Sequence, residues 1–179
     1  MLDDRTATQD LAEQVAALRR ELRHLQDREA IRDLVARYAW TADLEQYDDW
    51  LDTLTEDCVW TMSGMAMPGA PQGDGGVVRG RDGCFSAVSS PAHGEMVNRE
   101  QHHMTNLLIE VDGDSATAIG QLLLTIKVPG SFAIATCRLT RMRFRREGGR
   151  WLISELVFRE IGEQRGKDMI LETGLVPHR

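Results

Sequence analysis

Apolar residues near the start of the chain recur at helical spacing. On a background of Glu, Gln and Arg, the intervals between them alternate between four and three residues: Leu11, Val15, Leu18, Leu22 and Leu25. This spacing is typical of an amphipathic helix with coiled-coil character, and such a helix needs a partner surface for its apolar side. We therefore interpret residues 1–26 as an N-terminal helix that makes a packing or oligomer contact.

A second helix is predicted directly after the first. Asp27 is a suitable N-cap, and helical periodicity continues to about Asp43. The apolar positions of this helix are Ala30, Ile31, Leu34, Val35 and Tyr38. A shorter helix is predicted over residues 47–54.

From Asp57 onward, the pattern is that of strands. A first strand is predicted over residues 58–62, a short helix over 81–89, and four longer strands over 103–111, 116–128, 132–146 and 151–161. Gly-rich pairs at 113–114 and 148–149 stand where hairpin turns belong. Helices followed by an antiparallel meander predict an α+β fold, with the helices packed on one face of a curved sheet.

The segment over residues 63–76 has no periodicity and is crowded with Gly, Pro and Met. This composition predicts a loop. Because it carries Met65 and Met67, we interpret it as a candidate lid over a hydrophobic site.

The last predicted strand is apolar on both faces. One parity holds Trp151, Ile153 and Val157, and the other holds Leu152, Leu156 and Phe158. One face can close over the helices, and the other can pair with another subunit. We therefore expect a homo-oligomer.

Composition and charge limit the domain count and the partners. With 179 residues, 42% of them hydrophobic, the chain suits one globular domain, which we place at residues 27–163 with a C-terminal tail at 164–179. A formal net charge of -7 argues against nucleic-acid binding, which needs a clustered positive surface. Arg141, Arg143 and Arg145 alternate with Met142 and Phe144, which is typical of a solvated strand face.

Cysteine usage and the lack of long apolar runs indicate the compartment. The three cysteines, Cys58, Cys84 and Cys137, have no metal-ligand spacing, and their sparse, odd number suits a reducing environment. They are interpreted as small buried residues, with Cys58 as a nucleophile left open. No run resembles a signal peptide or a membrane span, so we expect a cytoplasmic protein without a membrane partner.

A pair of histidines, His102 and His103, begins the first long strand. Imidazole titrates near neutral pH, which makes histidine the usual general acid or base. Adjacent strand residues point to opposite faces, so only one of the two can enter a given pocket. His103 shares the parity of Leu107 and Ile109 and is therefore the candidate base. Because the two rings diverge, a metal site on this pair is not expected.

The order of helices and strand carries a family resemblance. The phrase Arg28-Glu29-Ala30-Ile31-Arg32-Asp33-Leu34, followed by Tyr38, Asp43, Trp50, Trp60 and the strand over 102–106, resembles the SnoaL-like branch of the NTF2-like superfamily over residues 10–163. The resemblance implies a cone-shaped α+β barrel with a deep pocket between curved sheet and helices. It also implies enzymes that need no cofactor, assembled as trimers or dimers.

Within this family, the pattern is most similar to the bile-acid 7-alpha-dehydratases. It is less similar to the scytalone dehydratases, whose second pocket histidine has no counterpart here. The match implies four catalytic residues, Tyr38, Asp43, His103 and Arg159. Asp43 would orient His103 to remove a proton, Tyr38 would donate to a carbonyl oxygen or leaving hydroxyl, and Arg159 would hold negative charge. The expected substrate pocket comprises Trp40, Tyr47, Trp60, Met62, Asn106 and Phe132.

Sequence analysis therefore predicts a dehydratase acting on a hydrophobic polycyclic, steroid-like or polyketide-like molecule. Isomerisation, cyclisation and epoxide hydrolysis are alternatives on the same scaffold, because fold does not fix the reaction. A non-catalytic ligand-binding or assembly subunit is a further alternative. In that case Tyr38 is a core residue, Asp43 caps a helix, and Arg159 pairs with Glu155 or Glu160.

Overall fold

A computed structural model of the chain describes residues 2–63, 76–89 and 99–177. The predicted loop, with its proposed role as a lid, lies almost entirely outside these residues. The elements follow in the order α1 (Leu2–Asp43), α2 (Tyr47–Leu51), β1 (Leu54–Met62), β2 (Gly76–Arg79), α3 (Gly80–Val88), β3 (Glu100–Asp112), β4 (Ser115–Val128), β5 (Ser131–Glu147), β6 (Arg150–Glu160) and α5 (Gln164–Leu171). In the described residues, no helix combines the length and apolarity that crossing a membrane requires.

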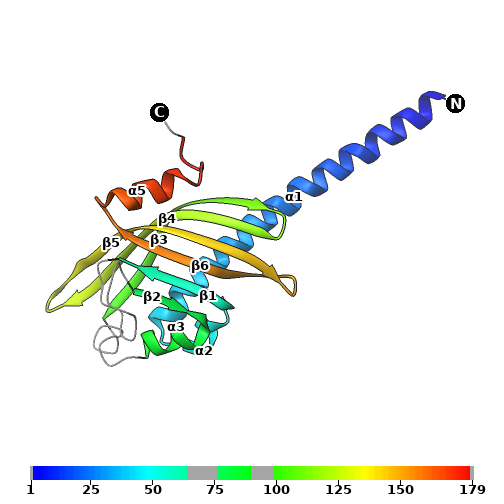
Figure 1. The fold of residues 1–179 in the computed structure, drawn as a ribbon. Coiled ribbons are helices and arrows are strands. Elements are labelled where there is room, and N and C mark those ends of the chain that lie inside the picture. Colours follow the sequence, from blue (N-terminus) through cyan, green and yellow to red (C-terminus); the bar gives the residue numbers. More distant parts are fainter. Residues whose placement is uncertain (1, 64–75, 90–98, 178–179) are drawn as a thin grey trace.

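The strands form one curved, open sheet in the order β2-β1-β6-β5-β4-β3. Figure 1 shows α1, α2 and α3 on one side of this sheet and α5 on the other. The predicted α+β cone is thus confirmed, with two differences. The sheet is mixed, because β1 runs parallel to β6, and it contains β2, a short strand that the sequence pattern did not reveal.

The N-terminal helices predicted as two form one continuous helix, α1, of 42 residues. The prediction that Asp27 caps a second helix was wrong, because the Asp27 side chain has stronger partners in the sheet. Its carboxylate accepts a hydrogen bond from Trp151 Nε1 at 3.1 Å and lies 2.6 Å from Arg146 Nη2. Asp27 therefore anchors the middle of α1 to the β5–β6 hairpin, and the first half of the helix projects beyond the domain (Figure 1).

Replacing Asp27 with Asn should lower the free energy of unfolding near neutral pH by about 1–2 kcal/mol. Burial raises the pKa of Asp27, but hydrogen bonds from Arg146 and Trp151 outweigh burial, and the net pKa lies below its ordinary value. A carboxyl with a depressed pKa stabilises the fold above its unfolded pKa, and this stabilisation is lost as the pH falls through the folded value. The difference between wild type and Asp27→Asn should therefore shrink below about pH 4.

Urea unfolding at pH 7 and pH 3 measures this effect. The matched control is Asp114→Asn, because Asp114 also contacts Arg146, at 3.0 Å, but is largely exposed. Its effect should be small at both pH values. An equal loss from both variants would show that the anchor to α1 contributes nothing specific.

Aromatic side chains fill the space between the helices and the concave face of the sheet. Trp50 of α2 lies with its ring centroid 5.6 Å from that of Tyr38 and 6.0 Å from that of Trp60. Trp60 in turn contacts Phe158 edge to face at 6.5 Å. These rings form the centre of the hydrophobic core, and they fix α1 and α2 against β1 and β6.

The convex face of β6 is partly covered by α5, a helix in the segment that the sequence pattern predicts as a tail. A methyl group at Gly166 of α5 would lie 3.0 Å from Arg159 Cβ and 3.2 Å from Leu139 Cδ1, so only glycine allows this close approach. Part of the apolar outer face of β6 is thus covered within the chain itself.

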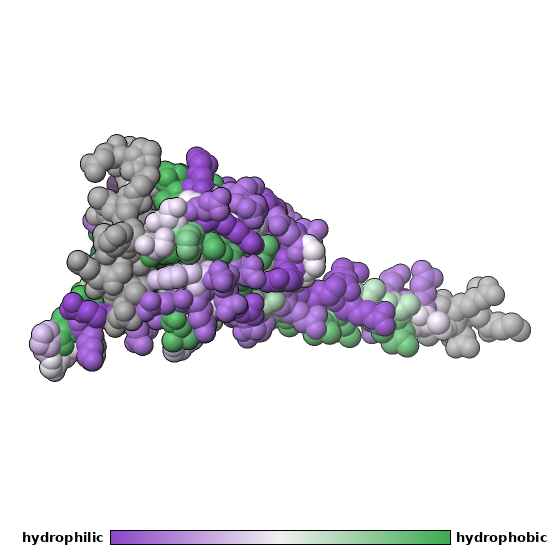
Figure 2. Space-filling model, turned by 90° about the horizontal axis from the view of Figure 1, so that it is seen from below, coloured by the Kyte–Doolittle hydropathy of each residue, from purple (hydrophilic) through white to green (hydrophobic). Residues whose placement is uncertain are grey.

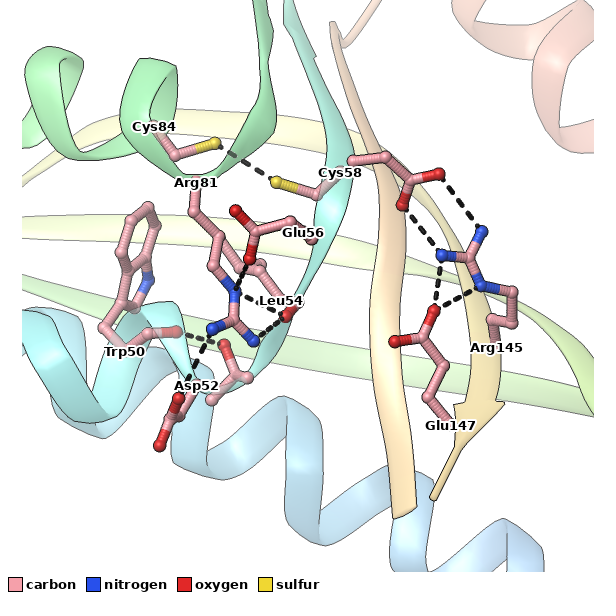
Figure 3. A network of polar contacts seen from close by, with 11 residues as sticks. Trp50, Asp52, Leu54, Glu56, Cys58, Arg81, Cys84, Arg145 and Glu147 are labelled. Carbon is pink, nitrogen blue, oxygen red and sulfur yellow. Dashed lines mark hydrogen bonds and ion pairs between the residues drawn. The ribbon is translucent and has the colours of Figure 1, made fainter. Parts of the chain in front are cut away.

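A polar network fastens α3 to β1 (Figure 3). Arg81 donates two hydrogen bonds to the Leu54 carbonyl oxygen, at 3.1 and 2.7 Å. Nearby, the Cys58 and Cys84 sulfur atoms lie 3.5 Å apart, and both side chains are buried. Although the hydrogen bond with Cys84 lowers the pKa of Cys58, a thiol with 1% exposure is a packing residue rather than an accessible nucleophile.

Candidate functional site

A β-bulge in β3 decides which histidine faces α1. Thr105 pairs with Gln121 and Leu108 with Ile119, so β3 holds one residue more than β4 between these pairs. Asn106 adopts a positive φ of 54°, as an extra residue in a bulge often does. Side chains alternate between the two faces of a strand, and the extra residue shifts this alternation by one. Even-numbered residues therefore face the helices before the bulge, and odd-numbered residues face them after it.

Gly120 of β4 makes room for this bulge. A Cβ atom at this position would lie 2.9 Å from the Thr105 carbonyl oxygen and 2.8 Å from Leu107 Cδ2. Both distances are too short for a real contact, and the first is to rigid backbone. Glycine at position 120 is therefore a steric requirement of the bulge.

Because of the bulge, His102 contacts the helix side of the sheet, and it is His102 that Asp43 binds. Asp43 Oδ1 lies 2.7 Å from His102 Nδ1, and the carboxylate also accepts the His102 backbone N–H at 3.0 and 3.1 Å. The side chains are 20% and 9% exposed, respectively for His102 and Asp43. The predicted hydrogen bond between Asp43 and His103 is absent. The face of His103 was predicted from Leu107 and Ile109, which lie beyond the bulge, but before the bulge the faces are exchanged.

His103 points to the other face of β3. Its Nε2 atom lies 3.1 Å from the Thr125 hydroxyl on β4, and the residue is exposed. Asn106, expected in the substrate pocket, is also exposed and donates a hydrogen bond to Gln121 Oε1 at 2.8 Å. Neither residue faces the core.

The Asp43–His102 pair borders a groove between α1 and β3, which we call the edge groove. Its volume is about 370 Å³, within the usual range of small-molecule pockets. Arg32 and Asp43 both belong to the helix wall of this groove. The other lining residues, besides His102, are Val35, Ala36, Ala39, Trp40, Gln101, His103, Met104 and Leu107. A ligand in the edge groove would lie next to the His102 ring.

A second, wider groove of about 810 Å³, which we call the outer groove, lies on the far side of Trp40. His103 and Thr125 form part of its floor, and Phe132 and Lys127 come from the β4–β5 hairpin. Trp40 and Phe132, both expected in a pocket, are 60% and 75% exposed and line this open groove. The outer groove is therefore an open surface feature that adjoins the edge groove, because Trp40, Asp43, Gln101 and His103 line both.

Two of the predicted catalytic residues lie away from both grooves. Tyr38 is 4% exposed in the aromatic core, where burial raises the pKa of its hydroxyl. Arg159 lies on the convex face of β6 beneath α5, and β5 and β4 separate β6 from β3. The four residues expected to meet in one pocket are not brought together, and Asp43 with His102 is the pair that forms.

The other expected pocket residues belong to the core or its border. Trp60 and Met62 are buried on β1. Tyr47 is partly buried, with its ring 6.4 Å from that of Phe85 on α3, and burial raises the pKa of its hydroxyl.

Arg138 is a buried cation that the sequence reasoning overlooked. It donates a hydrogen bond to the Ser63 carbonyl oxygen and lies 3.8 Å from Glu160 Oε1, and burial lowers its pKa. The signal was present, since Arg138 shares the parity of Met142 on the apolar face of β5. The arginines of opposite parity are on the solvent side as expected: Arg141 and Arg143 pair with Glu155 and Arg145 pairs with Asp57.

Few potential metal ligands gather at the site. Among the parts of the chain that the structure describes, no three His, Cys, Asp or Glu side chains form a metal-binding group. The edge groove offers one carboxylate and one imidazole from the Asp43–His102 pair beside its apolar lining.

A six-stranded curved sheet with helices on its concave side defines the class of NTF2-like α+β cones. A family model described as a SnoaL-like domain matches residues 23–157, and the chain therefore belongs to the SnoaL-like family. The family resemblance inferred from the sequence is confirmed. A comparison with curated proteins gave no match.

Solved structures share this fold. The chain is similar to an NTF2-like protein with a cystatin-like fold from Novosphingobium aromaticivorans, at 24% identity over 90% of this chain and 96% of that one, with a TM-score of 0.75. It is also similar to the hexachlorocyclohexane dehydrochlorinase LinA-type3 from Novosphingobium barchaimii LL02, at 24% identity over 79% and 90% of the two chains, with a TM-score of 0.64. Family and neighbours thus agree on the fold of the chain.

Proposed function

We propose that the protein catalyses an elimination, with dehydration as the first choice, on a hydrophobic small molecule that binds in the edge groove. The observation that carries the proposal is the 2.7 Å contact between Asp43 Oδ1 and His102 Nδ1. A carboxylate at Nδ1 fixes the tautomer of the ring and leaves Nε2 as the atom that can take up a proton. His102 thus takes the role that the sequence pattern assigns to His103.

His102 Nε2 is the atom that removes the substrate proton. It has no hydrogen-bond partner among the described residues, and the ring borders the edge groove. Proton transfer from an acidic carbon to Nε2 would leave an imidazolium, which the adjacent Asp43 carboxylate stabilises. The hydroxyl then departs from the neighbouring carbon as the double bond forms, and it takes the proton from the imidazolium, so that water leaves and His102 returns to its neutral form.

The groove favours an elongated apolar molecule with an acidic end. Arg32 and Asp43 are eleven residues apart on α1, which corresponds to about 16 Å along the helix axis. The wall between them is mostly apolar. A polycyclic substrate could therefore span the groove with its reacting carbon at His102 and an acidic substituent near Arg32, whose guanidinium is partly exposed.

The similarity to a dehydrochlorinase supports elimination over the other reactions. That neighbour, by its name, removes hydrogen chloride from hexachlorocyclohexane, and this chemistry begins with the same abstraction of a proton from carbon. Isomerisation, cyclisation and epoxide hydrolysis remain alternatives that use the same pair. A ligand-binding or assembly subunit, in which the pair only joins α1 to β3, is the non-catalytic alternative.

Deuterium exchange tests the proposal whatever the final product is. The protein would be incubated in D2O with polycyclic hydroxy-ketones, each supplied as a carboxylic acid and as its methyl ester, and with hexachlorocyclohexane. We expect mass spectrometry to show deuterium incorporation and loss of water, faster for the acids than for the esters. If no compound that demonstrably binds showed either exchange or elimination, the proposal would be overturned in favour of a binding subunit.

A further inference from the structure

The first half of α1 carries an apolar stripe that its own domain does not cover. The stripe consists of Leu11, Val15, Leu18, Leu22 and Leu25, whose side chains are between 38% and 64% exposed. Figure 2 shows hydrophobic residues along one side of the projecting helix. Apolar side chains at five successive seam positions on a free helix are costly to leave in water.

The direction of the stripe rules out an intramolecular partner. With about 100° per residue, the stripe faces roughly opposite to the side of α1 that packs on the sheet, which includes Ile31, Val35 and Tyr38. The helix is continuous through Asp43 and is anchored at Asp27. It therefore cannot turn the stripe toward its own domain without breaking.

The width of the stripe argues against a lipid surface. Its residues follow a strict four-three spacing, which gives a seam of about 80°, narrower than the 100° or more of a helix face that lies on a large apolar surface. Acidic residues Asp10, Glu13 and Glu21 alternate with the basic ones on the same segment. Such mixed charge does not suit an anionic membrane.

We propose that two copies of the chain pair through this stripe as a parallel, in-register, two-stranded coiled coil. In this arrangement every stripe residue meets the same residue of the second copy. An antiparallel pair can keep the layers of a coiled coil in two registers. One register places Leu25 opposite Thr8 and the other places Leu11 opposite Glu29, so each leaves a leucine opposite a polar residue. A β-branched residue at one seam position, Val15, with leucines at the alternating positions suits two strands.

The flanking residues fit the same arrangement. Those that meet across the seam are Gln14 with Arg19 and Glu21 with Gln26 of the second copy, so no like charges face each other. Because the stripe faces away from the domain, the two domains lie on opposite sides of the paired helices. The coil thus joins the two domains through the projecting halves of their α1 helices.

Sedimentation equilibrium of the full chain tests the pairing. We expect a dimer for the wild type and a monomer for Leu18→Glu/Leu22→Glu, with unchanged thermal unfolding of the domain, because both leucines are exposed in the single chain. The matched control is Ala16→Glu/His24→Glu, which adds two acids on the opposite side of the helix and should stay dimeric. A wild-type monomer, or a dimer that persists in the seam variant, would overturn the proposal.

Cross-linking tests the direction. In a Cys137→Ser background, Leu11→Cys should form an interchain disulfide under mild oxidation, because position 11 meets itself in a parallel pair. Ala16→Cys, on the far side, should not. Failure of Leu11→Cys in a confirmed dimer would contradict the parallel arrangement. The stripe would instead be a lipid-binding surface if the wild type bound vesicles of phosphatidylcholine and phosphatidylserine and the Leu18→Glu/Leu22→Glu variant did not. This result would contradict the proposed pairing.

Discussion

The His102→Asn variant should lose about 100- to 10,000-fold in the rate of deuterium exchange, the range that a positioned general base contributes. Asn retains the polarity and approximate size of the side chain but cannot take up a proton. The measurement is the initial rate on whichever compound the wild type exchanges, at one fixed pH for wild type and variant. Thermal unfolding should change little, because the backbone N–H of residue 102 can still donate to Asp43.

The adjacent histidine provides the matched control. His103→Asn should retain most of the wild-type rate, because the His103 ring contacts Thr125 rather than Asp43, although the residue also borders the edge groove. Asp43→Asn should give an intermediate loss, since the ring remains but its tautomer is no longer fixed. If His103→Asn lost the activity and His102→Asn kept it, the reaction would take place on the outer face. If His102→Asn and Asp43→Asn were both fully active, the Asp43–His102 pair would have a structural role only.

The Gly120→Ala variant should be destabilised by about 1–3 kcal/mol, the range for a methyl group forced into a filled space. Alanine ordinarily favours a strand more than glycine does, so a loss here would point to the steric conflict with the Thr105 carbonyl oxygen. We also expect a lower exchange rate, because relief of the conflict requires β3 to shift near His102. Urea unfolding and the exchange assay measure the two effects.

A second substitution separates the two contacts at Gly120. Leu107→Ala removes the flexible side chain that lies 2.8 Å from the added methyl group, but leaves the backbone carbonyl at 2.9 Å. Adding Leu107→Ala to Gly120→Ala should therefore restore little stability. Full recovery in the double variant would mean that side-chain crowding, and not the bulge, makes glycine necessary. An unchanged Gly120→Ala variant would show that the bulge does not depend on glycine.

The order and type of most elements followed from the sequence, because hydrophobic periodicity is a local property. The four long strands and the short helix α3 lie close to where the pattern predicted them. The parallel pairing of β1 with β6 did not follow, because it joins segments almost a hundred residues apart. Nor did the continuity of α1, since Asp27 has the properties of an N-cap until its partners Arg146 and Trp151 are known.

The histidine that contacts Asp43 is one residue away from the predicted one, and this difference has a definite cause. Strand parity assigns one face to each residue only while the strand is regular, and the bulge at Asn106 exchanges the faces. The sequence held a clue, because Met104 and Leu107 are both apolar yet have opposite parity. Placing both on the helix side requires one extra residue between them, and that placement also turns His102 toward Asp43. The remote positions of Tyr38 and Arg159 depend on tertiary packing that spacing alone does not reveal.

The position of β3 at the edge of the sheet gives Asp43 a second role. β3 is the last strand of the sheet, so its outer backbone groups have no neighbouring strand, and such groups can recruit the strand of another molecule. Asp43 accepts the outward N–H of His102, and α1 lies along the same margin. The carboxylate proposed to orient the base therefore also occupies one of the outward N–H groups through which another strand could add to this edge.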